Sequence, residues 1–339
     1  MSGPATPASV AAALQRWLAD EFGGDAHLDG EVVPNGDGFD AAIFFVRFVG
    51  ETVPSAWREP LVVRVKPSVA ALDIARREAA IQDWVADRGY PTPRVLRVFA
   101  PGELLSRPVQ IMARAPGRIV LSEIQSRPWA VRRMLRAMAA LHAELHALDP
   151  AGFPDGPDLL DNRLALTRRT AEELGHVGLR RGLERVEPLL PTLRDAPGAV
   201  CHGDFHPLNV LVADDSMAVI DWTDAGVGDP AGDVARTLAL LSIAHLAGSS
   251  RVEKAALRVV GPVLARTYRS AYADLASIDM ARVGRWVPVH LLHRWSQAVG
   301  ATAGMFDEAE GDDVGAQLPD GLAEELSRRF DAALDAVTS

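Results

Sequence analysis

Two short polar loops beside a pair of apolar strands constrain this chain more than any other feature. Residues 201–212 read CHGDFHPLNVLV, and residues 219–222 read VIDW. The first loop supplies the carboxylate of Asp204 and the amide oxygen of Asn209, and the second supplies the carboxylate of Asp221. Phosphoryl transfer from a nucleotide needs one carboxylate to orient and deprotonate an alcohol, and a carboxamide with a second carboxylate to hold magnesium. The order of these side chains therefore predicts a phosphoryl-transfer site.

The interval between Asp204 and Asn209 equals that in the catalytic loop of protein kinases, where an Asp precedes the metal-binding Asn. These motifs resemble the aminoglycoside phosphotransferase family of kinase-like enzymes, which also includes choline, homoserine and macrolide kinases. The residues that carry the resemblance are 202–209, 220–222, 228–230 and Asp233, with 76–78 and 89–96 upstream. The resemblance covers most of the chain, apart from about the first thirty residues and the final third past the helix of Asp233.

The resemblance implies an α+β, protein-kinase-like fold with two lobes: an N-terminal lobe with an antiparallel sheet and a larger, mainly helical C-terminal lobe. The residue pattern agrees with that expectation. Runs rich in Val, Ile and Phe, punctuated by Asn-Gly and Asp-Gly, predict strands at 32–33, 43–49, 61–65, 95–99 and 109–112. Apolar residues at helical spacing predict helices at 10–18, 70–86, 130–147, 162–173, 179–193, 234–247, 252–275, 281–301 and 322–337.

A Pro-Gly pair interrupts the pattern where the sheet is expected to stop, so the hinge between the lobes is predicted at 114–117. The N-terminal, nucleotide-binding lobe is then 1–113. The helical lobe, for catalysis and substrate, is 118–339.

The first lobe contains candidates for nucleotide binding. The loop with Gly36 and Gly38 would fold its backbone amides over the phosphates, although a hairpin turn needs the same residues. Met112 would close the back of an adenine pocket, where a Met is also ordinary core filler. The backbone from Ala113 to Ala115 would then bind the adenine edge.

Charged side chains of the first lobe complete that set. Arg64 takes the position of the lysine that holds the α- and β-phosphates in kinases, and Lys66, two residues on, points to the same face as the alternative anchor. Glu78 would pair with that cation and keep it aimed. A solvated carboxylate near the start of a helix is the other interpretation of Glu78.

In the second lobe we assign Asp204 as the base that accepts the proton of the acceptor hydroxyl. His206 would stabilise charge on the transferring phosphoryl group, and His202 would brace the loop. Asn209 and Asp221 would hold Mg²⁺, which prefers oxygen ligands. The expected function is ATP- or GTP-dependent phosphorylation of a small-molecule alcohol, with antibiotic resistance among the roles that the family resemblance implies.

Bulk properties set limits on partners and location. The net charge of −10 argues against nucleic acid as a partner and suits a cationic substrate, although solubility alone explains it. The single cysteine, Cys201, excludes an internal disulfide and fits a reducing compartment. No basic segment followed by a long apolar run opens the chain, and we expect a cytoplasmic protein without a membrane partner. The oligomeric state stays open.

Two other functions fit parts of the sequence. A metallohydrolase would use a transition-metal cluster of His202, Asp204, His206, Asp221 and Asp224. A non-catalytic module would only bind the nucleotide. His142 and His146, a helical turn apart as in zinc sites, are instead assigned to a helix that supports the catalytic loop, because the Glu between them is one residue out of place for a zinc protease.

The acceptor itself stays open between aminoglycosides, macrolides, amino alcohols and other metabolites. The family builds its acceptor site from helices after the catalytic loop. Placement alone makes candidates of Asp224, Trp286, His290, His293, Arg294 and Trp295.

Overall fold

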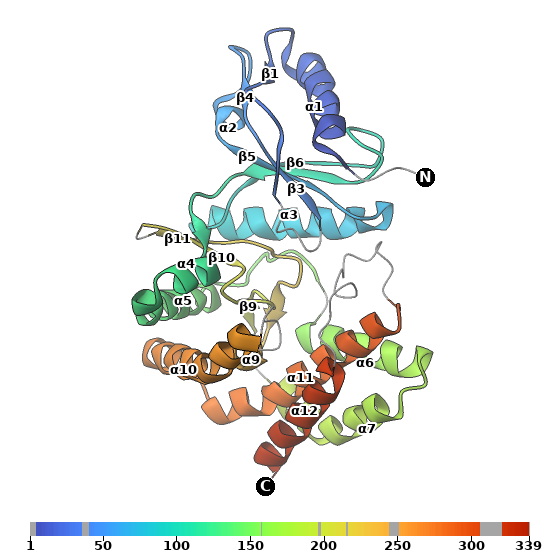
Figure 1. Ribbon diagram of the computed structural model, residues 1–339, viewed down its shortest axis with the longest axis vertical. Helices are drawn as coiled ribbons and strands as arrows, with labels where there is room; N and C mark the ends of the chain where they lie inside the picture. The colour runs from blue at the N-terminus through green and yellow to red at the C-terminus, as the bar shows by residue number, and fades with distance from the viewer. Residues whose placement is uncertain are drawn as a thin grey trace. The chain divides into compact units, whose positions relative to one another are not determined.

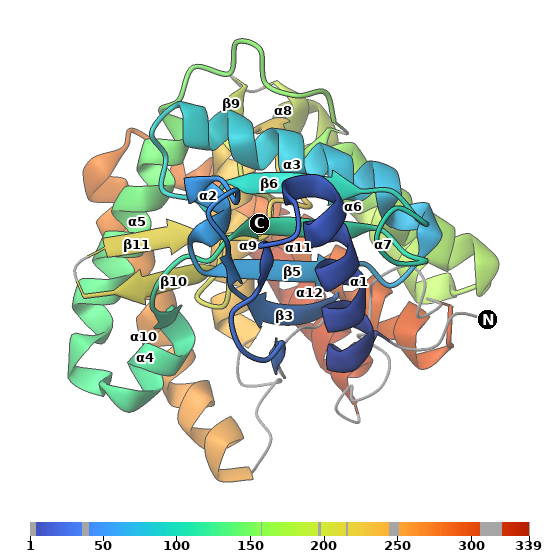
Figure 2. The same cartoon turned by 90° about the horizontal axis from the view of Figure 1, so that it is seen from above.

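The computed structural model describes residues 5–35, 41–156, 158–195, 198–214, 216–243, 251–305 and 321–338, with the backbone alone for 251–259. These residues form two compact units, one ending at Pro116 and one beginning at Gly117. Figures 1 and 2 show the elements of both units. None of the helices in these described ranges has the length and apolar content needed to span a bilayer.

The first unit is built on an antiparallel sheet of five strands in the order β2-β3-β5-β7-β6. Their bounds are Val33–Asn35, Ala42–Val46, Leu61–Val65, Val109–Ala113 and Val95–Phe99. A second ribbon pairs β1 (His27–Leu28) with β4 (Phe48–Val49). The helices are α1 (Pro7–Phe22), α2 (Ser55–Arg58), η1 (Val69–Ala71) and α3 (Leu72–Asp87). Figure 1 shows α1 and α3 on opposite faces of the sheet.

The two faces of β5 explain this arrangement. Side chains alternate along a strand, so Leu61, Val63 and Val65 enter a core cluster with the buried residues of α1. Arg64, between two of them, points to the other face and contacts α3. α1 itself begins at a Thr6 cap, whose hydroxyl accepts the amide of Ser9 at 3.2 Å.

The second unit is mainly helical, with two small antiparallel sheets. The sheets have the orders β11-β10-β8 and β12-β9. Their bounds are β8 Arg118–Ile119, β9 Ala199–Cys201, β10 Val210–Ala213, β11 Ser216–Val219 and β12 Gly226–Gly228. The helices are α4 Val120–Ser126, η2 Pro128–Ala130, α5 Val131–His146, α6 Leu159–Glu173, α7 Val177–Val186, η3 Glu187–Leu189, α8 Leu190–Arg194, α9 Pro230–Ile243, α10 Arg251–Leu275, α11 Met280–Thr302 and α12 Leu322–Thr338.

The core of the second unit lies around α11. This helix packs against α12, α9 and α6, while α10 packs against α5 and α9 (Figure 1). α9 therefore lies between two helical layers, and its polar side chains can contact the loop that follows β9.

The prediction of an antiparallel sheet followed by a mainly helical portion is confirmed. One predicted helix, at 179–193, is wrong as a single element, because the structure divides it into α7, η3 and α8. Pro188 and Pro191 each occupy the first turn of one of the later pieces. A proline removes a backbone donor and clashes with the preceding turn, so the helix restarts at each one.

Candidate active site

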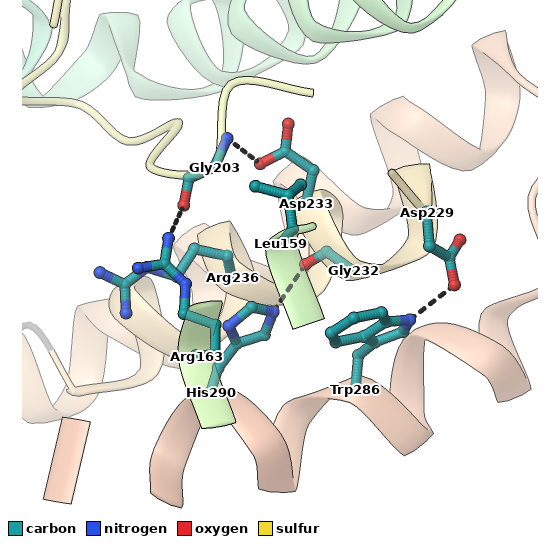
Figure 3. Close-up of a pocket in the computed structure, with 9 residues that line it drawn as sticks. All are labelled: Leu159, Arg163, Gly203, Asp229, Gly232, Asp233, Arg236, Trp286 and His290. Carbon is teal, nitrogen blue, oxygen red and sulfur yellow. Dashed lines mark hydrogen bonds between the residues drawn. The ribbon is translucent and has the colours of Figure 1, made fainter. Parts of the chain in front are cut away.

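The loop between β9 and β10 is held in place by one buried carboxylate. Asp233, on the first turn of α9, is 1% exposed. Its Oδ1 accepts the amide of Gly203 at 2.9 Å, and its Oδ2 accepts the amide of His202 at 2.6 Å. Two backbone donors of the loop are thus fixed by a side chain from a helix, as Figure 3 shows for Gly203.

Two histidines of α5 complete the environment of Asp233. The Nε2 atoms of His142 and His146 lie 2.9 and 3.2 Å from its Oδ2. Their Nδ1 atoms are hydrogen-bonded to the hydroxyls of Tyr268 and Tyr272. Burial raises the pKa of Asp233, but the two histidines outweigh burial and hold it well below its ordinary value. Burial also lowers the pKa of His142 to about 4, so a neutral ring donates to an ionised carboxylate.

These three residues are the group of possible metal ligands found within the described ranges, with ligand atoms within 4.8 Å of one another. Each histidine nitrogen already has a protein partner, so the group forms a complete hydrogen-bond network. The interpretation of His142 and His146 as support for the catalytic loop agrees with this geometry.

Asp204 projects from the loop with both carboxylate oxygens engaged. Its Oδ1 accepts from Nε of Arg236 at 3.0 Å and from Nη2 at 2.9 Å, and its Oδ2 lies 3.1 Å from Nε2 of His206. Burial raises the pKa of Asp204, but the charges of His206 and Arg236 have the larger effect and hold the pKa well below its ordinary value. The side chain is 26% exposed. Asp204 is therefore an ionised, accessible carboxylate.

Sequence reasoning missed Arg236, which is 3% exposed. It follows Asp233 by three residues on α9, and residues three apart on a helix share a face. Since Asp233 binds the amides of this loop, the three-residue spacing is the signal that places Arg236 beside the same loop.

Asn209 and Asp221 lie at the same end of the β10–β11 hairpin. Val210 pairs with Val219, and the amide of Ile220 donates to the carbonyl of Asn209 at 3.0 Å. The side-chain Nδ2 of Asn209 donates to the backbone carbonyl of Asp204 at 3.0 Å, so Oδ1 of Asn209 points away from that contact. An amide oxygen and a carboxylate in such proximity along the chain suit a hard cation such as Mg²⁺.

The backbone at Asp221 has an unusual conformation. Its φ is 67°, in the left-handed region that non-glycine residues seldom adopt. Strain of this kind gathers at functional sites, where the surrounding structure maintains it. The hydroxyl of Thr223 donates to Oδ1 of Asp221 at 3.0 Å.

In the first unit, one buried carboxylate binds two cations. Glu78 is 0% exposed, its Oε1 accepts from Nη1 of Arg64, and its Oε2 accepts from Nζ of Lys66 at 2.7 Å. Burial raises the pKa of Glu78, but Arg64 and Lys66 outweigh burial and lower it to about 2. The solvated interpretation of Glu78 is therefore wrong, and both candidate anchors share a single counterion.

Three other predicted nucleotide-binding residues, Met112, Ala113 and Ala115, lie at the end of β7 or just beyond it. Met112 is 5% exposed, and its sulfur lies 3.8 Å from Nε2 of Gln82. Ala113 is the last residue of β7, and Ala115 is half-buried in the segment that follows it. Gly36 and Gly38 lie outside the described residues.

Four of the acceptor candidates do not fit that role. Trp286, His290, His293 and Trp295 are all buried in α11. Trp286, for example, donates its indole N–H to Asp229 at 2.6 Å (Figure 3). These residues form the interior of the helical unit, because α11 has neighbours on several sides. Asp224, in contrast, pairs with Arg163 at 2.7 Å and is 30% exposed.

The metallohydrolase alternative has no support in the structure. Nε2 of His202 lies 3.1 Å from the carbonyl oxygen of Ile220, and its Nδ1 accepts the amide of Asp204 at 3.3 Å. Both ring nitrogens therefore brace the loop. Cys201 is buried, and burial, with the nearby Asp233 and Asp229, raises the pKa of its thiol well above the ordinary value, so it is no nucleophile.

Comparison with known proteins gives one family. A model of the phosphotransferase enzyme family matches residues 31–268. Viomycin phosphotransferase of Streptomyces vinaceus is 30% identical over 176 residues, which cover 48% of this chain and 59% of that protein. Acyl-CoA dehydrogenase family member 10 of Mus musculus is 27% identical over 191 residues, which cover 52% of this chain and 18% of that protein. The chain thus spans less than two thirds of the length of these curated relatives.

Solved structures show the same fold over nearly the whole chain. The ternary complex of a thermostable mutant of aminoglycoside phosphotransferase APH(4)-Ia with ADP and hygromycin B has a TM-score of 0.63. It is 18% identical, and the match covers 96% of this chain and 99% of that one. At this identity the likeness concerns the fold alone.

Proposed function

Because the chain belongs to the phosphotransferase enzyme family, we propose that it transfers the γ-phosphate of ATP to a hydroxyl group of a small molecule. One observation carries this proposal: the ionised Asp204 lies on a loop fixed by Asp233, next to the hairpin end that holds Asn209 and Asp221. A base and two oxygen ligands are the parts that phosphoryl transfer needs.

In the proposed reaction, Asp204 accepts a hydrogen bond from the acceptor hydroxyl and takes its proton as the new O–P bond forms. The bond between the γ-phosphorus and the bridging oxygen breaks, and ADP leaves with that oxygen. His206, 3.1 Å from Asp204, would stabilise charge on the transferring group. Asn209 and Asp221 would hold Mg²⁺, which when bound neutralises charge on the phosphates.

Arg64 and Lys66 are proposed as anchors of the nucleotide phosphates. Glu78 holds both cations in fixed positions, so their orientation does not depend on the nucleotide. Met112 and the backbone of Ala113 and Ala115 are proposed to contact the adenine. Gly36 and Gly38 remain candidates for a loop over the phosphates.

The acceptor class is proposed from the names of similar proteins. Viomycin, from one relative, and hygromycin B, from a structure of the same fold, make hydroxyl-bearing antibiotics the first compounds to test. Amino alcohols, macrolides and sugars complete the panel, because the fold alone does not select among them.

The test is an assay of acceptor-dependent ADP release across this panel with wild-type protein and two matched variants. Asp204→Asn is expected to lower kcat by about 10²–10⁴, since it removes the base. Asp214→Asn is the control: Asp214 is exposed in the turn of the same hairpin, and its φ of 52° suits Asn. Equal turnover by Asp204→Asn and wild type would refute the assignment of the base.

A further inference from the structure

A small cavity lies directly behind the catalytic loop (Figure 3). Its wall includes Gly203 of the loop, Gly232 of α9 and the apolar side chains of Leu159 and Trp286, together with Arg163, Arg236 and His290. The volume within which the centre of a water molecule can lie is about 10 Å³, close to the smallest volume that holds one water.

Two residues of this wall each have one buried polar atom without a hydrogen-bond partner among the protein atoms that the structure describes: Nη1 of Arg236 and Nδ1 of His290. The residues are 3% and 4% exposed, so bulk solvent does not satisfy them. A buried polar group without a partner loses its hydration with nothing in return. The remaining nitrogens of Arg236 are engaged, since Nε and Nη2 contact Asp204.

The hydrogen-bond roles of the two atoms are fixed by their neighbours. Nε2 of His290 lies 2.8 Å from the carbonyl oxygen of Gly232, and a carbonyl only accepts, so Nε2 carries the proton. Burial, followed by the charges of Arg236 and Arg163, lowers the pKa of His290 to about 3, which keeps the ring neutral. Its Nδ1 is then an acceptor, whereas Nη1 of Arg236 is a donor.

The ligand of this cavity must therefore both accept and donate. A halide would accept from Arg236 but would face the lone pair of His290. A metal cation would bind His290 but would be repelled by the guanidinium groups of Arg236 and Arg163. We propose that the cavity is a binding site for one ordered water, which accepts from Arg236 and donates to His290, and that this bridge makes Arg236 a positioning residue for Asp204.

The bridge would link the loop to two helices. It runs from Asp204 through Arg236 and the water to His290 on α11, and from there to the carbonyl of Gly232 on α9. Because the water would hold Nη1, the other two nitrogens of Arg236 would keep their contacts with Oδ1 of Asp204. Oδ2 of Asp204 would then remain beside His206. The role in positioning the base rests on the proposed function, whereas the water site does not.

The water site is tested first by a crystal structure of the wild-type protein at about 1.8 Å resolution or better. The expected result is a water peak within hydrogen-bond distance of Nη1 of Arg236 and Nδ1 of His290 at about 2.7–3.2 Å. A cavity without density, or an anomalous peak there after a bromide soak, would overturn the proposal. This measurement does not depend on any activity of the protein.

The positioning role is tested by two substitutions of one residue. His290→Phe keeps a ring but removes both polar atoms, and His290→Gln keeps a donor for Gly232 and an acceptor for the water. We expect His290→Phe to lower kcat about tenfold with the nucleotide KM unchanged, and His290→Gln to stay within about threefold of wild type. Wild-type kcat in His290→Phe would overturn the role.

Structures of the two variants decide the matter if no acceptor is found. Arg236 displaced from Oδ1 of Asp204 in His290→Phe, but not in His290→Gln, supports the proposal. Arg236 unmoved in His290→Phe contradicts it. If His290→Phe does not fold, the structures of wild type and His290→Gln still test the site. Absence of the water peak from the wild-type structure is enough by itself to reject the site.

Discussion

Replacement of Glu78 by Gln is the change whose consequence follows most directly from the geometry. Glu78 is 0% exposed and is the shared counterion of Arg64 and Lys66, whose side chains are 11% and 5% exposed. The amide would retain one oxygen acceptor but would turn an N–H group toward a cation, and two buried positive charges would lose their counterion. Removal of one partner from a buried ion pair costs about 3–5 kcal/mol.

The pKa of Glu78 gives a second measure of the same interaction. Its decrease from 4.5 to about 2 favours the charged form in the folded protein by about 3 kcal/mol, at about 1.4 kcal/mol per pH unit. Because the folded-state pKa is lowered, this stabilisation is complete above pH 4.5 and is lost as the pH falls toward 2. Both measures predict that Glu78→Gln reduces the free energy of unfolding by about 3 kcal/mol at pH 7.

The assay is urea unfolding of wild type and variant, followed by circular dichroism and by tryptophan fluorescence, to which Trp84 on the same helix contributes. The difference in the free energy of unfolding between wild type and Glu78→Gln should decrease by about 1 kcal/mol as the pH falls from 6 to 4. Glu173→Gln is the control, since Glu173 forms an exposed pair with Arg169 at 3.0 Å and should cost less than about 0.5 kcal/mol. A loss below about 1 kcal/mol for Glu78→Gln, or a pH-independent difference, would refute the reasoning.

Three further changes test the second unit. Asp233→Asn should lower the free energy of unfolding by about 3–5 kcal/mol in urea unfolding, because an N–H group would face the loop amides. Asp73→Asn is the control: that side chain is 95% exposed, and the substitution should change the free energy of unfolding by less than about 0.5 kcal/mol. Asp221→Asn should weaken Mg²⁺-dependent ATP binding in calorimetry by about tenfold or more, while Asp214→Asn, also at a positive φ, should not; equal affinities would reject the magnesium assignment. The raised thiol pKa of Cys201 predicts no reaction with a disulfide reagent at pH 8 until denaturant is added, and rapid reaction of native protein would contradict it.

The fold and the candidate site differ in how much of them the sequence could predict. The five strands of the main sheet in the first unit, and the pairing of β10 with β11, follow from local patterns that are contiguous in the chain. The short ribbon of β1 and β4 does not, since the pattern predicts one strand at 43–49. The same is true of Asp204 and Asn209, which one loop brings together. The division of 179–193 into three short helices could also have been predicted, because Pro188 and Pro191 stand in the sequence.

Contacts across the chain could not be predicted in this way. The contact of Arg236 with Asp204 joins residues separated by 32 positions, and the cavity behind the loop adds His290 of α11. Periodicity shows that α11 is a helix, but it does not show which of its polar residues turn inward, because apolar and polar residues share its buried faces. His290 was therefore placed near the acceptor, whereas the structure places it behind the catalytic loop.

The interior of the second unit explains why its polar residues are hard to interpret from sequence. Asp229, Asp233, Arg236, His142 and His290 are all buried, and in most proteins such residues are exposed unless they are paired. Each is costly by itself and is tolerated because another element of the unit supplies a hydrogen-bond or charge partner. A network of this kind fixes the catalytic loop through many weak constraints. The removal of one member should therefore displace Asp204 even when the loop sequence is unchanged, and this effect would separate residues that support the proposed base from the proposed base itself.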